Sequence, residues 1–95
     1  MYGTVARLKL APGAEAKMTE LMKSDDMESI DGVVSTTVYK LDSGDNVYIM
    51  SVVFESKEKY VANAESPEMD ARYQQFRALL VADPEWMDGE IVYHT

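Results

Sequence analysis

The chain opens with a stretch in which apolar and polar side chains alternate. A period of two indicates a strand with one buried side, so we predict a strand over residues 2–10. Proline and glycine at positions 12 and 13 end this strand. One side of the strand carries Tyr2, Thr4, Ala6, Leu8 and Leu10, and the other carries Val5, Arg7 and Lys9.

Apolar residues recur at helical spacing in two later stretches. The first covers residues 14–25, with Ala14, Met18, Leu21 and Met22 on one side, and it frays in residues 24–26. The second covers residues 58–82 and is divided by Pro67, which fits a first helical turn, with Ser66 as the N-cap. In this second part we predict a buried stripe of Met69, Tyr73, Phe76 and Leu80.

Three further strands are predicted. Residues 33–41 and 47–54 are rich in β-branched side chains and are separated by a polar, glycine-containing stretch, which indicates an antiparallel hairpin. Residues 82–85 end the last helix, residues 86–89 form a turn, and residues 90–94 form a short final strand. The order βαββαβ predicts an α+β, ferredoxin-like domain over residues 1–95: a four-stranded antiparallel sheet with all helices on one face and the second helix split in two.

The strand over residues 47–54 is apolar on both sides, and this suggests a partner. The helices cover one side, with Tyr48, Met50, Val52 and Phe54, but the other side also carries Val47, Ile49 and Val53. A monomer of 95 residues has nothing left to cover that second face. We therefore expect a homodimer through the helix-free face of the sheet.

Charge and composition exclude several functions. Seventeen acidic and nine basic residues give a formal net charge of −8, which disfavours binding to nucleic acid. The sequence has no cysteine, no apolar run long enough for a membrane span, and no basic start followed by an apolar run near residue 1. We expect a soluble cytoplasmic protein without disulfides.

Conventional catalytic sets are missing from the sequence. One histidine and no cysteine cannot make a serine-type triad or a common metal site, and the five glycines are isolated from one another. We therefore predict no cofactor and no metal. An enzyme of this composition needs a substrate that supplies much of the reactivity itself.

Three stretches resemble the antibiotic biosynthesis monooxygenase family: RLKLAPGAEAKM at 7–18, FESKEKYVANAESPE at 54–68 and ADPEWMDGEIV at 82–92. The resemblance implies a dimeric α/β barrel with a pocket between sheet and helices in each subunit. It also implies a cofactor-independent monooxygenase that acts on a small or polycyclic phenol or quinol. Haem-degrading members of the family carry asparagine, tryptophan and histidine where this chain has Ala6, Asn63 and Tyr73, so we do not expect haem degradation.

Asn63 and Tyr73 are the catalytic candidates that the resemblance implies, as hydrogen-bond donors to a substrate oxygen. Asn63 is alternatively a helix cap, and Tyr73 a core residue with its hydroxyl at a rim. The substrate-binding candidates are Tyr60, Phe76, Trp86 and Met50, with Trp86 either a packing anchor or a stacking surface at the pocket mouth.

Two other features have plain structural explanations. Arg7 on the outer side of the first strand is explained by an ion pair at the dimer interface or by an anion site. His94, on the predicted final strand, is an improbable iron ligand.

A non-catalytic dimeric module that binds a small apolar or aromatic ligand is the alternative to the oxygenase.

Overall fold

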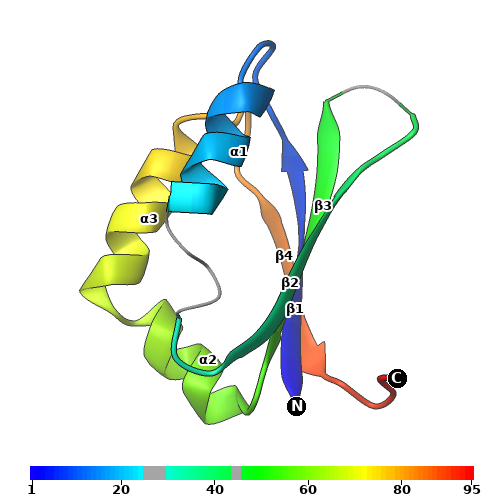
Figure 1. The fold of residues 1–95 in the computed structure, drawn as a ribbon, viewed down its shortest axis with the longest axis vertical. Coiled ribbons are helices and arrows are strands. Elements are labelled where there is room, and N and C mark those ends of the chain that lie inside the picture. The colour runs from blue at the N-terminus through cyan, green and yellow to red at the C-terminus, as the bar shows by residue number, and fades with distance from the viewer. Residues whose placement is uncertain (25–29, 44–45) are drawn as a thin grey trace.

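The computed structural model describes residues 1–24, 30–43 and 46–95, and they form four strands and three helices (Figure 1). The predicted fraying at residues 24–26 falls largely outside this part of the chain. No helix in the described part has the length and apolar content needed to cross a membrane. In chain order the elements are β1 (Tyr2–Lys9), α1 (Glu15–Ser24), β2 (Val33–Lys40), β3 (Val47–Phe54), α2 (Lys57–Ala64), α3 (Pro67–Arg77) and β4 (Glu85–Glu90).

The strands form one antiparallel sheet in the order β2-β3-β1-β4. All three helices lie on the same face of this sheet, and the two chain ends lie at the same end of it (Figure 1). This arrangement confirms the ferredoxin-like α+β fold predicted from the sequence. The β2–β3 hairpin is also confirmed, with Val38 opposite Met50 and Lys40 opposite Tyr48.

The core lies between the helices and the inner face of the sheet. Alternation along β1 and β3 directs every second side chain toward the helices, and Leu8 and Leu10 are the largest side chains that are fully buried. Burying an aliphatic side chain of this size contributes about 1.5–3 kcal/mol. The buried cluster consists of Ala6, Leu8, Leu10, Ala14, Met18, Tyr48, Met50, Val52, Phe54 and Leu80.

Serine residues begin both of the later helices. The Ser56 hydroxyl accepts a hydrogen bond from the Lys59 backbone N–H, and the Ser66 hydroxyl accepts one from the Met69 N–H. Pro67 follows Ser66 at the first helical position, where its missing N–H costs nothing. Each hydroxyl satisfies one of the N–H groups that a helix start leaves without a partner.

The prediction extended the last helix too far. It placed the end at residue 82, whereas α3 ends at Arg77. The backbone beyond it bonds to the end of β1 instead: the Ala11 N–H donates to the Leu79 carbonyl oxygen, and the Val81 N–H donates to the Lys9 carbonyl oxygen. Leu80 is therefore buried through a bridge with Leu10 and does not belong to the helical stripe.

The predicted final strand over residues 90–94 was wrong, and so was the turn over residues 86–89. β4 covers residues 85–90 and pairs with β1 from Arg7 opposite Glu85 to Tyr2 opposite Glu90. The N-terminus of β1 sets this limit, because the last backbone bond joins the Ile91 N–H to the Met1 carbonyl oxygen. His94 consequently lies outside any strand and is exposed.

The helix-free face of the sheet is partly apolar, as the sequence indicated. Tyr39 and Met87 on this face are 56% and 55% exposed. Arg7 also lies here, exposed, between Ile49 of β3 and Glu85 of β4. The ion pairs found among the described residues, which do not include Arg7, are Lys40–Glu15, Lys59–Asp31 and Arg77–Asp83.

Candidate functional site

A pocket of about 440 Å³ lies between the inner face of the sheet and the α2–α3 pair. Its volume is within the range of about 300–1,000 Å³ that small-molecule sites usually have. The sheet contributes residues from all four strands, and the helices contribute residues from both sides of the α2–α3 junction. The lining consists of Thr4, Ile30, Val33, Met50, Val52, Phe54, Tyr60, Asn63, Ala64, Met69, Asp70, Tyr73, Trp86 and Asp88.

Five of the predicted site residues meet at this pocket: Asn63, Tyr73, Tyr60, Trp86 and Met50. The sixth, Phe76, lines a smaller adjoining cavity of about 60 Å³ that shares Met50, Met69, Tyr73 and Trp86 with the main pocket. Trp86 reaches the pocket from β4, where it stands opposite Ala6, and not from a turn. The prediction that Trp86 lies in a turn was therefore wrong, although the residue does line the pocket.

The junction between α2 and α3 positions Asn63 and Tyr73. The Ser66 hydroxyl donates to the Asn63 carbonyl oxygen at 2.8 Å and accepts from the Met69 N–H at 3.1 Å. Ser66 therefore caps α3 while holding the last turn of α2. In this geometry Asn63 takes part in the cap through its backbone, and the residue is also part of the pocket lining.

One end of the pocket carries a polar cluster of Thr4, Tyr60 and Asp88. The Thr4 hydroxyl donates to Oδ1 of Asp88 at 2.6 Å, and these residues stand opposite each other on β1 and β4. Burial, and then the neighbouring Asp88 carboxylate, raise the pKa of Tyr60, since both disfavour loss of its proton. The Tyr60 ring packs 5.2 Å from the Tyr2 ring and 5.3 Å from the Phe54 ring, measured between centroids.

Neither Thr4 nor Asp88 was predicted from the sequence as a site residue. Thr4 had a weak signal, because it is a polar residue at an inward position of β1 between Tyr2 and Ala6. Asp88 had none, because its Asp-Gly pair is typical of a turn. Asp70, in the first turn of α3, also lines the pocket and was not predicted.

Apart from Asn63, Asp70 and Tyr73, the rest of the pocket wall is apolar. Met50, Val52 and Phe54 of β3 form the floor, and Trp86 and Met69 flank it. The described residues include no cluster of three or more histidine, cysteine, aspartate or glutamate side chains that could bind a metal ion. The pocket therefore suits a flat apolar ligand with one or more polar groups at its edge.

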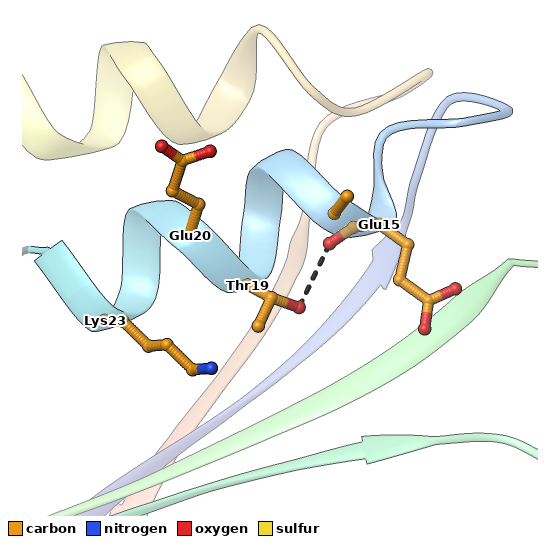
Figure 2. Close-up of a pocket in the computed structure, with 5 residues that line it drawn as sticks. Glu15, Thr19, Glu20 and Lys23 are labelled. Carbon is orange, nitrogen blue, oxygen red and sulfur yellow. Dashed lines mark hydrogen bonds between the residues drawn. The ribbon is translucent and has the colours of Figure 1, made fainter.

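Two other hollows lie on or beside α1, away from the α2–α3 pair. Figure 2 shows one on the surface of α1, along which Glu15, Thr19, Glu20 and Lys23 are all exposed. The Thr19 hydroxyl there donates to the Glu15 carbonyl oxygen within the helix. A side chain that is already solvated gains little from contact with a ligand, so this surface is a poor binding site.

The second hollow is a groove between α1 and β2. It is lined in part by Tyr48 and Thr36, whose hydroxyl oxygens are buried without a hydrogen-bond partner in the described structure. Burial, and then the nearby Glu15 carboxylate, raise the pKa of Tyr48. Glu15 also pairs with Lys40 at 3.3 Å, which joins α1 to β2 at the groove.

No family model matches the sequence, and no curated protein matches it. Solved structures do match the fold. A proposed antibiotic biosynthesis monooxygenase from Deinococcus radiodurans superposes with a TM-score of 0.83 at 13% identity, over 100% of this chain and 96% of that chain. Rv0793 from Mycobacterium tuberculosis gives a TM-score of 0.80 at 17% identity, over 98% and 96%.

A third structure is that of SnoaB from Streptomyces nogalater, a cofactor-independent oxygenase, in a variant with an asparagine replaced by alanine. It superposes with a TM-score of 0.83 at 18% identity, over 98% of this chain and 94% of that chain. Likeness at these identities concerns the fold. This chain therefore has the fold of antibiotic biosynthesis monooxygenase structures.

Proposed function

We propose that the protein is a cofactor-independent monooxygenase that oxidises a small or polycyclic phenol or quinol in the pocket between sheet and helices. The observation that carries the proposal is the pocket itself, an apolar chamber of about 440 Å³ with Asn63 and Tyr73 on one wall. The likeness to SnoaB supports the same chemistry, because that protein is a cofactor-independent oxygenase with this fold.

The apolar walls hold the substrate ring and exclude water. Trp86 and Met50 contact its faces, Tyr60 lies at the polar end, and Phe76 supports the wall from the adjoining cavity. Asn63 and Tyr73 donate hydrogen bonds to the substrate oxygen on which negative charge develops. Donors that are already oriented in a dry pocket stabilise such charge more than water does.

The reaction balances without an added cofactor. Deprotonation of the substrate leaves an electron-rich anion, which passes an electron to O₂. The substrate radical and superoxide combine to a peroxide anion, which takes up the proton released in the first step and becomes a hydroperoxide. Loss of water from the hydroperoxide leaves the ring carbon as a carbonyl, so one oxygen atom enters the product and the other leaves as water. The substrate supplies all the electrons, and the protein supplies orientation and charge stabilisation.

Oxygen uptake with a panel of hydroquinones and anthrones tests the proposal. The double variant Asn63→Ala/Tyr73→Phe should lose about 10²-fold or more in kcat, because removal of one donor to a developing oxyanion already costs that much. The matched control is Gln74→Ala/Tyr93→Phe, which changes an exposed amide and an exposed phenol away from the pocket. Uptake by the wild type no faster than by the Asn63/Tyr73 variant would refute the proposal.

A second candidate is a non-catalytic module that binds a small aromatic ligand. The observation in its favour is that the pocket lining contains no histidine, although histidine is the most frequent catalytic acid or base. A comparison of ligand binding with oxygen consumption distinguishes the two candidates. A ligand that binds tightly in the pocket but consumes no oxygen in any form of the assay identifies the binding module.

We further propose that two copies pair through the helix-free face into an α/β barrel. Support comes from the apolar side chains on this face: a single copy leaves Tyr39 and Met87 exposed and Val5, Ile49 and Val53 half-buried. Light scattering should give a mass about twice the 10.7 kDa of the chain. A clean monomer at micromolar concentration would exclude the barrel.

A further inference from the structure

Thr4 is a buried polar residue at an inward position of β1, at 4% exposure. Its hydroxyl is satisfied by the short hydrogen bond to Oδ1 of Asp88, whose length of 2.6 Å is typical of a hydroxyl that donates to a charged oxygen. A buried hydroxyl at an inward strand position carries a cost unless it is bonded. Thr4 therefore has a specific task, which is to hold the Asp88 carboxylate at the pocket end of β4.

The carboxylate of Asp88 can accept hydrogen bonds in addition to the one from Thr4. An ionised carboxylate accepts about four hydrogen bonds through its two oxygens. Asp88 lines the pocket and is an exposed residue. It lies beside the Tyr60 phenol at the same end. The titratable and charged groups that face this region are Tyr60 from α2, Asp70 and Tyr73 from α3, and Tyr2 from β1, with the Lys57 ammonium 5.9 Å from the Tyr2 ring centroid.

We propose that Asp88 is the acceptor and base for the hydroxyl of the substrate, so that the pocket binds neutral phenols in preference to phenolates. This inference rests on the proposed function for the class of substrate. The neutral phenol donates its O–H to the carboxylate. When the reaction begins, the proton moves to Asp88, which becomes a neutral carboxylic acid, and the electron pair stays on the phenolic oxygen.

The charge balance of the pocket explains this preference. A phenolate that enters already charged meets the carboxylates of Asp88 and Asp70, and like charges repel one another. A phenolate formed inside the pocket avoids this penalty, because the proton that leaves the substrate neutralises Asp88. Asn63 and Tyr73 then remain as donors to the new anion.

Thr4 acts as a positioning residue in this arrangement. It contacts the carboxylate and orients it by donating to Oδ1. Tyr60 stays protonated well into the alkaline range, since the pKa of Tyr60 is raised by burial and by Asp88. The carboxylate is therefore the hydrogen-bond acceptor of this cluster, because the Tyr60 phenol keeps its own proton.

Equilibrium binding of 4-nitrophenol tests the inference without any oxygen chemistry, since this ligand does not react with O₂. Binding is measured by quenching of the single tryptophan, Trp86, at about pH 6 and about pH 9, which lie on either side of the ionisation of the ligand and below that of a tyrosine. 4-Nitroanisole, which has no hydroxyl to donate, is measured alongside. The wild type should bind neutral nitrophenol about tenfold more tightly than either nitrophenolate or the ether.

Four variants assign the effect to the cluster. Asp88→Asn should reduce the preference for the neutral phenol to about twofold or less, and Thr4→Val should reduce it part of the way. Thr4→Ser keeps the hydroxyl and should restore the preference. Glu20→Gln removes one charge from the exposed surface of α1 and should leave the preference unchanged (Figure 2).

Three results would overturn the assignment: an unchanged preference in Asp88→Asn, equal binding of phenol and ether by the wild type, or no binding of nitrophenol at either pH. Circular dichroism of each variant shows that the fold is retained. A protein that shows the preference but no oxygen uptake with any quinol keeps the Asp88 assignment and loses the oxygenase proposal. The two failures are thus distinguishable.

Discussion

Replacement of Ser66 by alanine tests how the site is held together, because this side chain joins the two helices that carry Asn63 and Tyr73. The hydroxyl makes two hydrogen bonds, as acceptor from the Met69 N–H at 3.1 Å and as donor to the Asn63 carbonyl oxygen at 2.8 Å. Alanine removes both. Threonine keeps the hydroxyl, and aspartate keeps only the ability to accept.

The magnitudes follow from these two bonds. Loss of a serine N-cap costs about 1 kcal/mol, and loss of a part-buried hydrogen bond adds about 0.5 kcal/mol or more. We expect Ser66→Ala to lower the free energy of unfolding by about 1.5 kcal/mol, which corresponds to a fall in Tm of about 6–12 °C for a domain of this size. Ser66→Asp should recover the cap but not the second bond, so its loss should be about 0.5–1 kcal/mol.

Urea denaturation, followed by circular dichroism and by the fluorescence of Trp86, measures these differences at one fixed protein concentration. Ser66→Thr serves as the matched control and should remain within about 0.5 kcal/mol of the wild type. An alanine variant within about 0.3 kcal/mol of the wild type would refute the assignment of both bonds. An aspartate variant as stable as the wild type would refute only the bond to Asn63.

Three further predictions concern the turn before β2, the alkaline limit of stability and the outer face. Gly32→Ala should cost about 2 kcal/mol or more, because φ is +87° and the new Cβ would lie 2.5 Å from a side-chain carbon of α2. Gly13→Ala, at φ +82° in open space, should cost only about 1 kcal/mol in the same urea assay. The pKa of Tyr60 is raised by burial and by Asp88, so its contribution to stability is present below about pH 10 and lost as the pH rises through the folded-state pKa. Tyr60→Phe should therefore flatten the fall in unfolding free energy above about pH 10, and an unchanged slope would contradict this. Met87→Lys should shift the mass measured by light scattering from dimer to monomer while circular dichroism stays unchanged, because this side chain is 55% exposed in a single copy.

Much of the candidate site was predictable from local patterns. Asn63, Tyr73, Tyr60 and Met50 all line the pocket, because the helical and strand periods that place apolar residues on the inner face also place these neighbours beside it. Phe76 lies one cavity away for the same reason. What these roles amount to in chemistry stays a prediction until oxygen uptake is measured.

The polar cluster could not be predicted, because its members come together only through long-range pairing. Thr4 and Asp88 are 84 positions apart in sequence and 2.6 Å apart in space. Nothing local to Asp88 indicates a strand, since aspartate followed by glycine favours a turn. The backbone hydrogen bonds that β1 offers at its free edge override that preference, as tertiary pairing often does for edge strands.

The sequence by itself determined the start of α3, the extent of β1, β2 and β3 to within about one residue, and the faces that β1 and β3 bury. Capping, side-chain period and β-branching are all properties of neighbouring residues, so they can be read along the chain. Only the tertiary structure decided where α3 ends, which residues form β4 and which carboxylate meets the pocket. In each case β1 provided the partner: its end bonds residues 79–81, and its edge sets the register that places Asp88 opposite Thr4.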